Sequence, residues 1–274
     1  MSLAWVGVAL VIGSAAAGLL GILTISAAPR RLVRENHAGR RVPSVLGLAL
    51  VGGLLAGALG GALGSEQALI PVAQALLGMA FLVAVTGLMD DLVGGEARGF
   101  GGHLRSLARG RPTTGILKLV VGVAAGTMLA VVIGGGALRT VAAAVLIAGS
   151  VNLWNALDVV PGRSLKWGIV VLAGVVFATR TEPFGLVTAA GLGGAVGVLP
   201  ADLTERGMLG DAGSNPLGLV AGAGLAVALS TAWVVVAASA VLALQIAAET
   251  VTISRLIRAV PPLRWVDDLG RRAT

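Results

Sequence analysis

The stretch LIPVAQALLGMAFLVAVTGLMDD, residues 69–91, carries the pattern that decides the fold. No charged side chain occurs until its last two residues, Asp90 and Asp91. An apolar run of about 20 residues is long enough to cross the hydrocarbon core of a bilayer as an α-helix. The stretch therefore predicts a membrane-spanning helix with two carboxylates at one end.

The same apolar pattern recurs along the whole chain of 274 residues, which is 56% hydrophobic and only 12% charged. A soluble domain has about 25% charged residues. The alternating pattern of a membrane β-barrel is absent. We therefore predict an all-α fold: a polytopic membrane helix bundle forming a single transmembrane domain over residues 1–274, with about nine transmembrane helices. The expected spans are approximately 3–26, 44–63, 69–89, 114–133, 138–155, 167–179, 185–199, 216–229 and 231–249.

The basic residues predict the orientation of these spans. Eighteen of the twenty lie on one side of the predicted bundle, and the exceptions are Arg139 and Arg180. Lys and Arg accumulate in cytoplasmic loops, so we expect the N-terminus outside and the C-terminus in the cytoplasm, in a multi-pass protein of the cell membrane. The first charges, Arg30 and Arg31, follow the first apolar run, which favours an uncleaved span over a signal peptide. The net charge of +7 then reflects membrane loops, and no nucleic acid partner is expected.

Glycine and cysteine contents narrow the possibilities further. The chain has 42 glycines, and the spacing of Gly53, Gly57 and Gly61 is typical of helices whose backbones approach closely in a membrane. Such glycine-rich spans are also compatible with a homodimer. No cysteine is present, which excludes disulfides and cysteine-based metal sites.

Three polar islands interrupt the apolar pattern, each at the end of a predicted span. They contain Asp90 and Asp91, then Asp158, then Asp211. Carboxylates are costly near lipid, so those retained there usually face a cavity and mark a site. The predicted orientation places all three islands on the cytoplasmic face.

The first two islands have competing interpretations. Asp90 and Asp91 can bind Mg²⁺ or share a proton, or they can be a solvated helix end. Asn152, Asn155 and Asp158 recur every three residues, which puts them on one face of a helix. That face indicates a polar site, and the alternative is a hydrogen-bond ladder between helices.

The third island places Asp211 between glycines, just before a predicted helix. Asn215 is the expected N-cap, with Pro216 at the first helical position. A helix N-terminus favours anions such as phosphate, and the alternative is a tight turn with a solvated carboxylate.

A basic, glycine-rich segment at residues 101–118 offers cationic groups. Arg105 and Lys118 are candidates for holding a diphosphate, and His103 for carrying a proton. The alternatives are ordinary cytoplasmic loop charge and an ordinary loop histidine. Lys118 lies about one turn inside the fourth span, so it should face a partner rather than lipid.

The order of these motifs resembles the polyprenyl-phosphate N-acetylhexosamine-1-phosphate transferases. That family includes phospho-N-acetylmuramoyl-pentapeptide transferase and the N-acetylglucosamine-1-phosphate transferases of O-antigen and teichoic acid synthesis. The likeness covers about residues 36–215, and the Arg-Arg-Val-Pro sequence at 40–43 resembles the family's first cytoplasmic loop. The resemblance implies an enzyme, a phosphoglycosyl transferase that moves a sugar-1-phosphate from a UDP-sugar to a polyprenyl phosphate and releases UMP. It also implies a need for Mg²⁺, with Mn²⁺ as an alternative, and a place in cell wall or envelope polymer synthesis.

The resemblance also implies roles for particular residues. Asp211 resembles the metal-binding aspartate, with Asp91 as a second metal carboxylate, and Asp90 and Asp91 resemble the pair that acts on the lipid phosphate. Lys118 resembles the lysine near the diphosphate. The candidate catalytic residues are Asp90, Asp91 and Asp211, and the candidate substrate-binding residues are Lys118, Asn152, Asn155, Asp158, His103 and Arg105.

The chain departs from the family at two places. Pro161 stands where the family often has a second acidic or amide residue, and a histidine-rich loop near the C-terminus is missing. These departures leave an alternative, a catalytically inactive relative that binds polyprenyl lipid or scaffolds an envelope-synthesis complex. A transporter is disfavoured, because its carboxylates would lie near mid-membrane rather than at one face.

The tail at residues 250–274 is predicted to be cytoplasmic and amphipathic. We expect its apolar side chains in the membrane interface and its arginines at anionic headgroups. The apolar residues are Leu263, Trp265, Val266 and Leu269, and the arginines are Arg264, Arg271 and Arg272.

Overall fold

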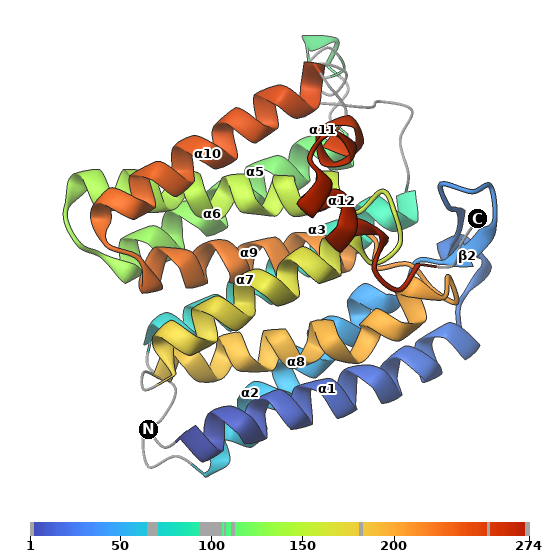
Figure 1. The fold of residues 1–274 in the computed structure, drawn as a ribbon, viewed down its shortest axis with the longest axis horizontal. Coiled ribbons are helices and arrows are strands. Elements are labelled where there is room, and N and C mark those ends of the chain that lie inside the picture. The colour runs from blue at the N-terminus through green and yellow to red at the C-terminus, as the bar shows by residue number, and fades with distance from the viewer. Residues whose placement is uncertain are drawn as a thin grey trace.

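The computed structural model describes residues 3–64, 71–93, 106, 108–110, 113–180, 183–250 and 253–271. In this part of the chain, eleven α-helices account for nearly all of the structure (Figure 1). The long helices are α1 (Leu3–Ser26), α2 (Leu46–Leu63), α3 (Pro71–Val93), α5 (Thr114–Ile133), α6 (Ala137–Leu157), α7 (Arg163–Thr179), α8 (Pro183–Leu203), α9 (Asp211–Ala228) and α10 (Thr231–Thr250). The short elements are η1 (Arg30–Leu32), β1 (Val33–Glu35), β2 (Arg41–Pro43), α11 (Ile253–Ala259) and α12 (Pro261–Asp268).

The helical fold confirms the predicted all-α class. Among the residues that the structure describes, six helices are long and apolar enough to cross a membrane, namely α1, α2, α3, α5, α6 and α8. Each of the nine long helices overlaps one of the expected spans. These apolar helices indicate a membrane protein, while the count of nine crossings and the orientation remain predictions.

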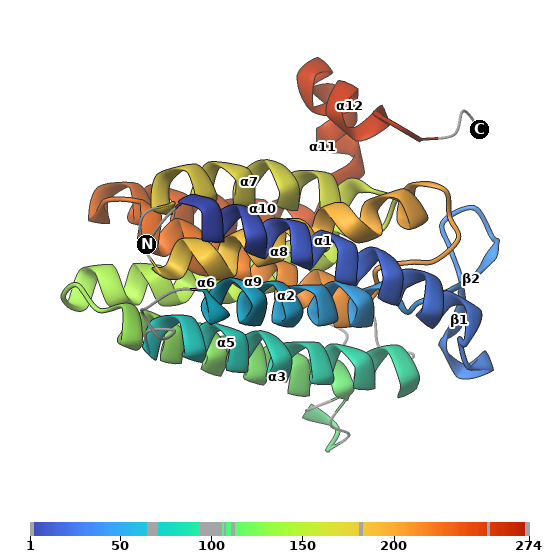
Figure 2. The same ribbon diagram turned by 90° about the horizontal axis from the view of Figure 1, so that it is seen from below.

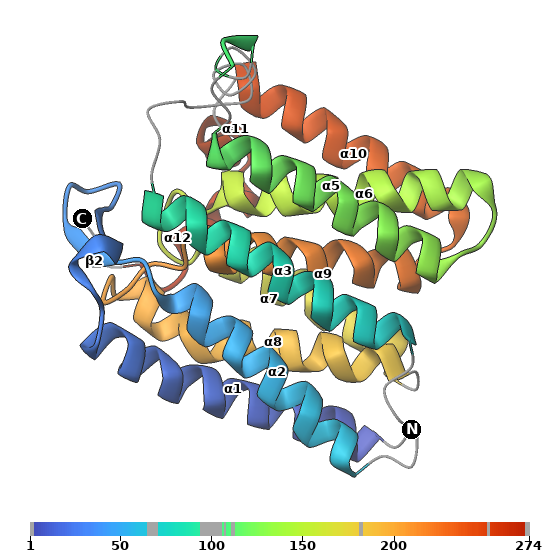
Figure 3. The same ribbon diagram turned by 180° about the vertical axis from the view of Figure 1, so that it is seen from behind.

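Helix α9 lies at the centre of the bundle, where it packs against α3, α6 and α7. One side of the bundle is formed by α1, α2 and α8, and the other by α5, α6 and α10 (Figures 1 and 3). Fourteen of the eighteen residues of α9 are buried. The polar residues at its N-terminus are consequently held inside the protein rather than at its lipid-facing surface.

Close packing of α1 against α2 depends on small residues, as the glycine spacing predicted. A Cβ atom at Gly53 would overlap the carbonyl oxygen of Gly13, and one at Gly57 would overlap that of Ala9. The predicted role of these glycines in helix packing is confirmed.

The basic segment after α1 forms a small antiparallel hairpin, in which Val33 pairs with Pro43. The hairpin is joined to the connection between α8 and α9, because Met208 N donates to Pro43 O at 2.7 Å and Leu46 N donates to Met208 O at 3.1 Å. These bonds fix an N-terminal loop beside a segment far away in the sequence, at the end of the bundle seen on the right of Figure 1.

The start of α9 differs from the prediction. Gly210 has φ +68°, which lets the chain turn sharply, and the helix begins at Asp211. Asp91 of α3 accepts hydrogen bonds from Asp211 N (3.2 Å) and Ala212 N (3.1 Å). Asn215 as N-cap was therefore wrong: a carboxylate from a distant helix caps α9, and both Asn215 and Pro216 lie inside it.

The two carboxylates lie at the end of α3, as predicted. The helix continues a few residues past the expected span, to Val93, so Asp90 and Asp91 lie in its last turn. This position directs Asp91 at the N-terminus of α9 and gives its cap a rigid support.

Candidate functional site

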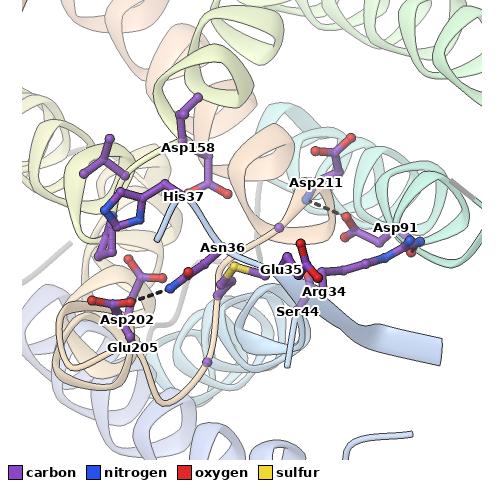
Figure 4. Close-up of a pocket in the computed structure, with 16 residues that line it drawn as sticks. Arg34, Glu35, Asn36, His37, Ser44, Asp91, Asp158, Asp202, Glu205 and Asp211 are labelled. Atoms are coloured by element: carbon purple, nitrogen blue, oxygen red, sulfur yellow. Dashed lines mark hydrogen bonds between the residues drawn. The ribbon is translucent and has the colours of Figure 1, made fainter. Parts of the chain in front are cut away.

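A pocket of about 410 Å³ opens at the end of the bundle that carries the hairpin (Figure 4). Its walls are the hairpin, the end of α3, the α6–α7 connection, and the segment from the end of α8 to the start of α9. The polar residues that line it are Arg34, Glu35, Asn36, His37, Ser44, Asp91, Asp158, Asp202, Glu205 and Asp211.

Three predicted site residues, Asp91, Asp158 and Asp211, line this one pocket. They come from three different polar islands, and Asp91 bonds to a residue 120 positions away. Figure 4 shows Asp91 and Asp211 together, joined by the bond from the Asp211 backbone. The three islands therefore converge on a single cavity.

Behind the pocket, Asp211 belongs to a buried polar network. Its Oδ1 accepts a hydrogen bond from Asn155 Nδ2 at 2.5 Å, and its other oxygen pairs with Lys118. Lys118 Nζ also lies 3.3 Å from Asp90 Oδ2, and Thr114 donates to Asp90. Lys118 was predicted to face a partner rather than lipid, and in the structure it has two carboxylate partners, Asp90 and Asp211.

The first backbone N–H groups of α9 all have acceptors. Asp91 takes those of Asp211 and Ala212, while Gly210 O accepts from Gly213 N (3.1 Å) and Ser214 N (2.9 Å). The anion at this helix N-terminus is therefore the Asp91 carboxylate, in the place where the sequence suggested a phosphate. Asp91 positions α9 and, through it, the side chain of Asp211.

Asp158 follows the last residue of α6 and faces the pocket. Burial raises the pKa of this carboxyl well above its ordinary value, and the nearby charges of Asp202 and Asp211 raise it further. A carboxylate in such surroundings is stabilised by any cation that enters the pocket.

The carboxylate oxygens of the pocket are suitable ligands for a hard divalent cation. Among the described residues, no group of three or more His, Cys, Asp or Glu side chains is arranged to enclose a metal by itself. Mg²⁺ does not need such a group, since it is usually bound by one or two carboxylates together with water and substrate phosphate oxygens. Asp158 and Asp211 supply carboxylates of this kind. Asp91, the second metal carboxylate expected from the sequence, accepts bonds from α9 with both oxygens, and both oxygens of Asp211 likewise have partners, in Asn155 and Lys118.

Asn152 lies away from this pocket. Its Nδ2 donates to Gln245 Oε1 of α10 at 2.9 Å, and Gln245 Nε2 donates to Gly149 O at 2.8 Å. This arrangement is the ladder between helices that was the alternative interpretation. Of the three residues predicted on one face, Asn155 bonds to Asp211, Asp158 lines the pocket, and Asn152 joins α6 to α10.

Two further candidates, His103 and Arg105, lie outside the described residues. Their predicted contacts with substrate remain predictions.

Sequence reasoning missed the hairpin residues of the pocket. Asn36 donates to Glu205 and Arg40 forms an ion pair with it, so the hairpin is tied to the segment after α8. Arg34 donates to the backbone oxygen of Asp91, and His37 lines the pocket. No local pattern in a short basic loop indicates that it folds back over a cavity.

Asp202 was also missed, although a signal for it was present. It lies just past the apolar run predicted as the seventh span, as the other site carboxylates do for their runs. In the structure, its Oδ2 accepts a bond from Gly162 N at 2.6 Å, and Gly162 has φ +74° at the start of α7. Asp202 therefore holds the turn that brings residues 158–161 to the pocket.

Comparison with known proteins gives this site no name. No protein-family model matches the chain, and no curated protein matches it either. The function is therefore inferred from the residues themselves.

Proposed function

We propose that this protein is a membrane phosphoglycosyl transferase, which moves a sugar-1-phosphate from a UDP-sugar to a polyprenyl phosphate. The observation that carries the proposal is the meeting of Asp91, Asp158 and Asp211 in one pocket at one end of the helices. This is what the resemblance requires of motifs that lie far apart in the sequence. The pocket also has the oxygen donors and the nearby lysine that phosphoryl transfer needs.

In the proposed reaction, an oxygen of the polyprenyl phosphate attacks the β-phosphorus of the UDP-sugar. A new P–O bond forms between the lipid phosphate oxygen and the β-phosphorus. The bond breaks between the β-phosphorus and the oxygen that joins it to the α-phosphorus. UMP leaves with that oxygen, and a polyprenyl diphosphate sugar remains. A bound Mg²⁺ would neutralise phosphate oxygens as the charge shifts between them.

The residues of the chain have separate roles in this proposal. Asp211 and Asp158 would hold the metal ion, and Asn155 orients Asp211 through its hydrogen bond. Lys118 offsets the negative charge of the network and offers a cation to the diphosphate. Asp91 is a positioning residue, because it fixes the start of α9.

The proposal includes a setting in the cell membrane. We propose nine crossings with the N-terminus outside, which puts the pocket on the cytoplasmic face, where nucleotide-sugars are available. The lipid substrate would reach the pocket from the bilayer. A homodimer is compatible with the glycine-rich helix faces, and it is not needed to complete the pocket.

The test is a direct assay with purified protein in lipid nanodiscs. The protein is incubated with undecaprenyl phosphate, Mg²⁺ and a panel of UDP- and other nucleotide-sugars, and the release of nucleoside monophosphate is followed. We expect release with one or a few nucleotide-sugars, dependent on both the lipid phosphate and Mg²⁺.

The control is the same protein without polyprenyl phosphate, which separates transfer from simple hydrolysis. If no nucleotide-sugar of the panel yields a monophosphate while undecaprenyl phosphate still binds, the protein is the inactive lipid-binding relative instead.

A further inference from the structure

The C-terminal tail is fastened to the bundle by a buried ion pair. Arg163 donates from Nε to Asp267 Oδ1 at 2.8 Å and from Nη2 to Asp267 Oδ2 at 2.9 Å, and both side chains are almost fully buried. Lys166 adds bonds to the backbone oxygens of Asp267 and Leu269, the latter at 3.0 Å. We call these contacts the tail clasp; they hold α12 in one orientation against the start of α7.

That orientation determines which charged side chains of the tail are buried and which are exposed. Asp267 points inward to the clasp, whereas Arg255, Arg258 and Arg264 are exposed. The remaining carboxylate of α11 and α12, Asp268, is exposed at their end and lies 3.8 Å from Arg271. The outer surface of the two short helices is therefore cationic.

The same outer surface is also apolar. Trp265 is 67% exposed, and Leu256, Val260 and Leu269 of the same tail are exposed as well. Arginines mixed with exposed tryptophan and aliphatic side chains are typical of helices that lie in the plane of a membrane interface. A surface that contacts only nucleic acid or water would be formed by polar and charged side chains, so the exposed apolar groups favour a membrane interface.

The position of the tail in the fold matches such a surface. Figure 2 shows α11 and α12 projecting sideways from the bundle beside α7, rather than continuing the line of its helices. Just before the tail, α10 exposes Leu242 and Ile246, which are suited to lipid. Arg271 Nε donates to Pro161 O, at the pocket lining, at 3.1 Å, so the tail lies at the end of the bundle where the pocket opens.

We propose that the surface formed by α11 and α12 binds anionic phospholipid headgroups, on the side of the membrane where the pocket opens. The arginines would meet the phosphates while Trp265 and Val260 enter the boundary between headgroups and acyl chains. Each arginine near an anionic surface strengthens binding about fivefold. The proposal depends on the membrane setting of the helices and not on the transferase activity.

A single fluorescent label tests it. The chain has no cysteine, so Val260→Cys provides a unique attachment point for an environment-sensitive dye. The labelled protein is placed in nanodiscs of phosphatidylcholine alone and of phosphatidylcholine mixed with phosphatidylglycerol. We expect a blue shift of the emission in the discs that contain phosphatidylglycerol.

Two triple variants make the test specific. Replacing Arg255, Arg258 and Arg264 by Gln should abolish the shift. Replacing three other exposed arginines, Arg30, Arg31 and Arg41, by Gln removes the same charge from the N-terminal loop and should leave it intact. Equal emission in the two kinds of disc, or a shift that survives loss of the tail arginines, would overturn the proposal. Because no nucleotide-sugar is used, these outcomes are independent of the transferase assay.

Discussion

Two regions of this protein bury charged groups, and they balance them in opposite ways. In the pocket network, Asp90 and Asp211 share the ammonium group of Lys118, and Asp91 accepts hydrogen bonds from the backbone of Asp211 and Ala212. In the tail clasp, one carboxylate, Asp267, is surrounded by three cationic side chains. An excess of carboxylates leaves room for an added cation, whereas a carboxylate saturated with donors is suited to holding two segments together. The difference separates a candidate site from a structural joint.

The largest effect should come from breaking the clasp. Arg163→Met leaves the buried carboxylate of Asp267 without its bidentate partner, and loss of one member of a buried pair costs about 3 kcal/mol or more. We expect a marked fall in the thermal unfolding temperature, and Arg258→Met, an exposed arginine of the same tail, is the control. Equal unfolding temperatures for the two variants would show that the clasp does not stabilise the fold.

The next effect concerns catalysis rather than stability. Asp211→Asn keeps the size of the side chain and removes the charge that would hold a metal, so nucleoside monophosphate release should fall on the order of 100-fold. The unfolding temperature should change little, since this change also relieves the excess of negative charge. Asp268→Asn, at an exposed acid of the tail, should retain activity. Unchanged release from the Asp211 variant would refute the assigned role.

A smaller effect is expected at Lys118. Lys118→Met removes the ammonium group that pairs with Asp90 and Asp211, and the loss of this charged donor should cost about 1 to 3 kcal/mol of stability. Mg²⁺ should then raise the unfolding temperature of the variant more than that of the wild type, because the ion replaces the lost charge. If Mg²⁺ stabilises both proteins equally, the pocket carboxylates do not share a cation site with Lys118.

The helices were predictable because their main determinant is local. The length of an apolar run sets the length of a spanning helix, so the nine expected spans match the nine long helices within several residues. The convergence of Asp91, Asp158 and Asp211 followed from a similar rule, since costly carboxylates at the same end of several helices tend to share a cavity.

What could not be predicted depends on partners distant in the sequence. Asn215 is a good local N-cap, but the cap is provided by Asp91. This residue lies 121 positions before Ala212, one of the two residues whose N–H groups it accepts. Asn152 and Asn155 were predicted on one helix face with Asp158, yet only the tertiary structure shows that Asn152 bonds to Gln245. Alternative pairings of this kind are equally compatible with the sequence.

The smallest effect should appear in the pH dependence of the tail. Although burial raises the pKa of Asp267, hydrogen bonds and charge from Arg163 and Arg271 outweigh it and hold the pKa below the ordinary value of 3.8. A carboxyl whose pKa is lowered by folding stabilises the folded state above its unfolded pKa. That stability is lost as the pH falls through the lowered value, so the clasp should be intact above about pH 4 and loosen only in stronger acid.

The dye at Val260→Cys should report this loosening as a change in emission at acidic pH. Asp267→Asn removes the titrating group and should abolish the acid transition, while Asp268→Asn should preserve it. A transition that persists without Asp267 would show that its carboxyl is not the titrating group, and that the clasp does not set the acid response of the tail.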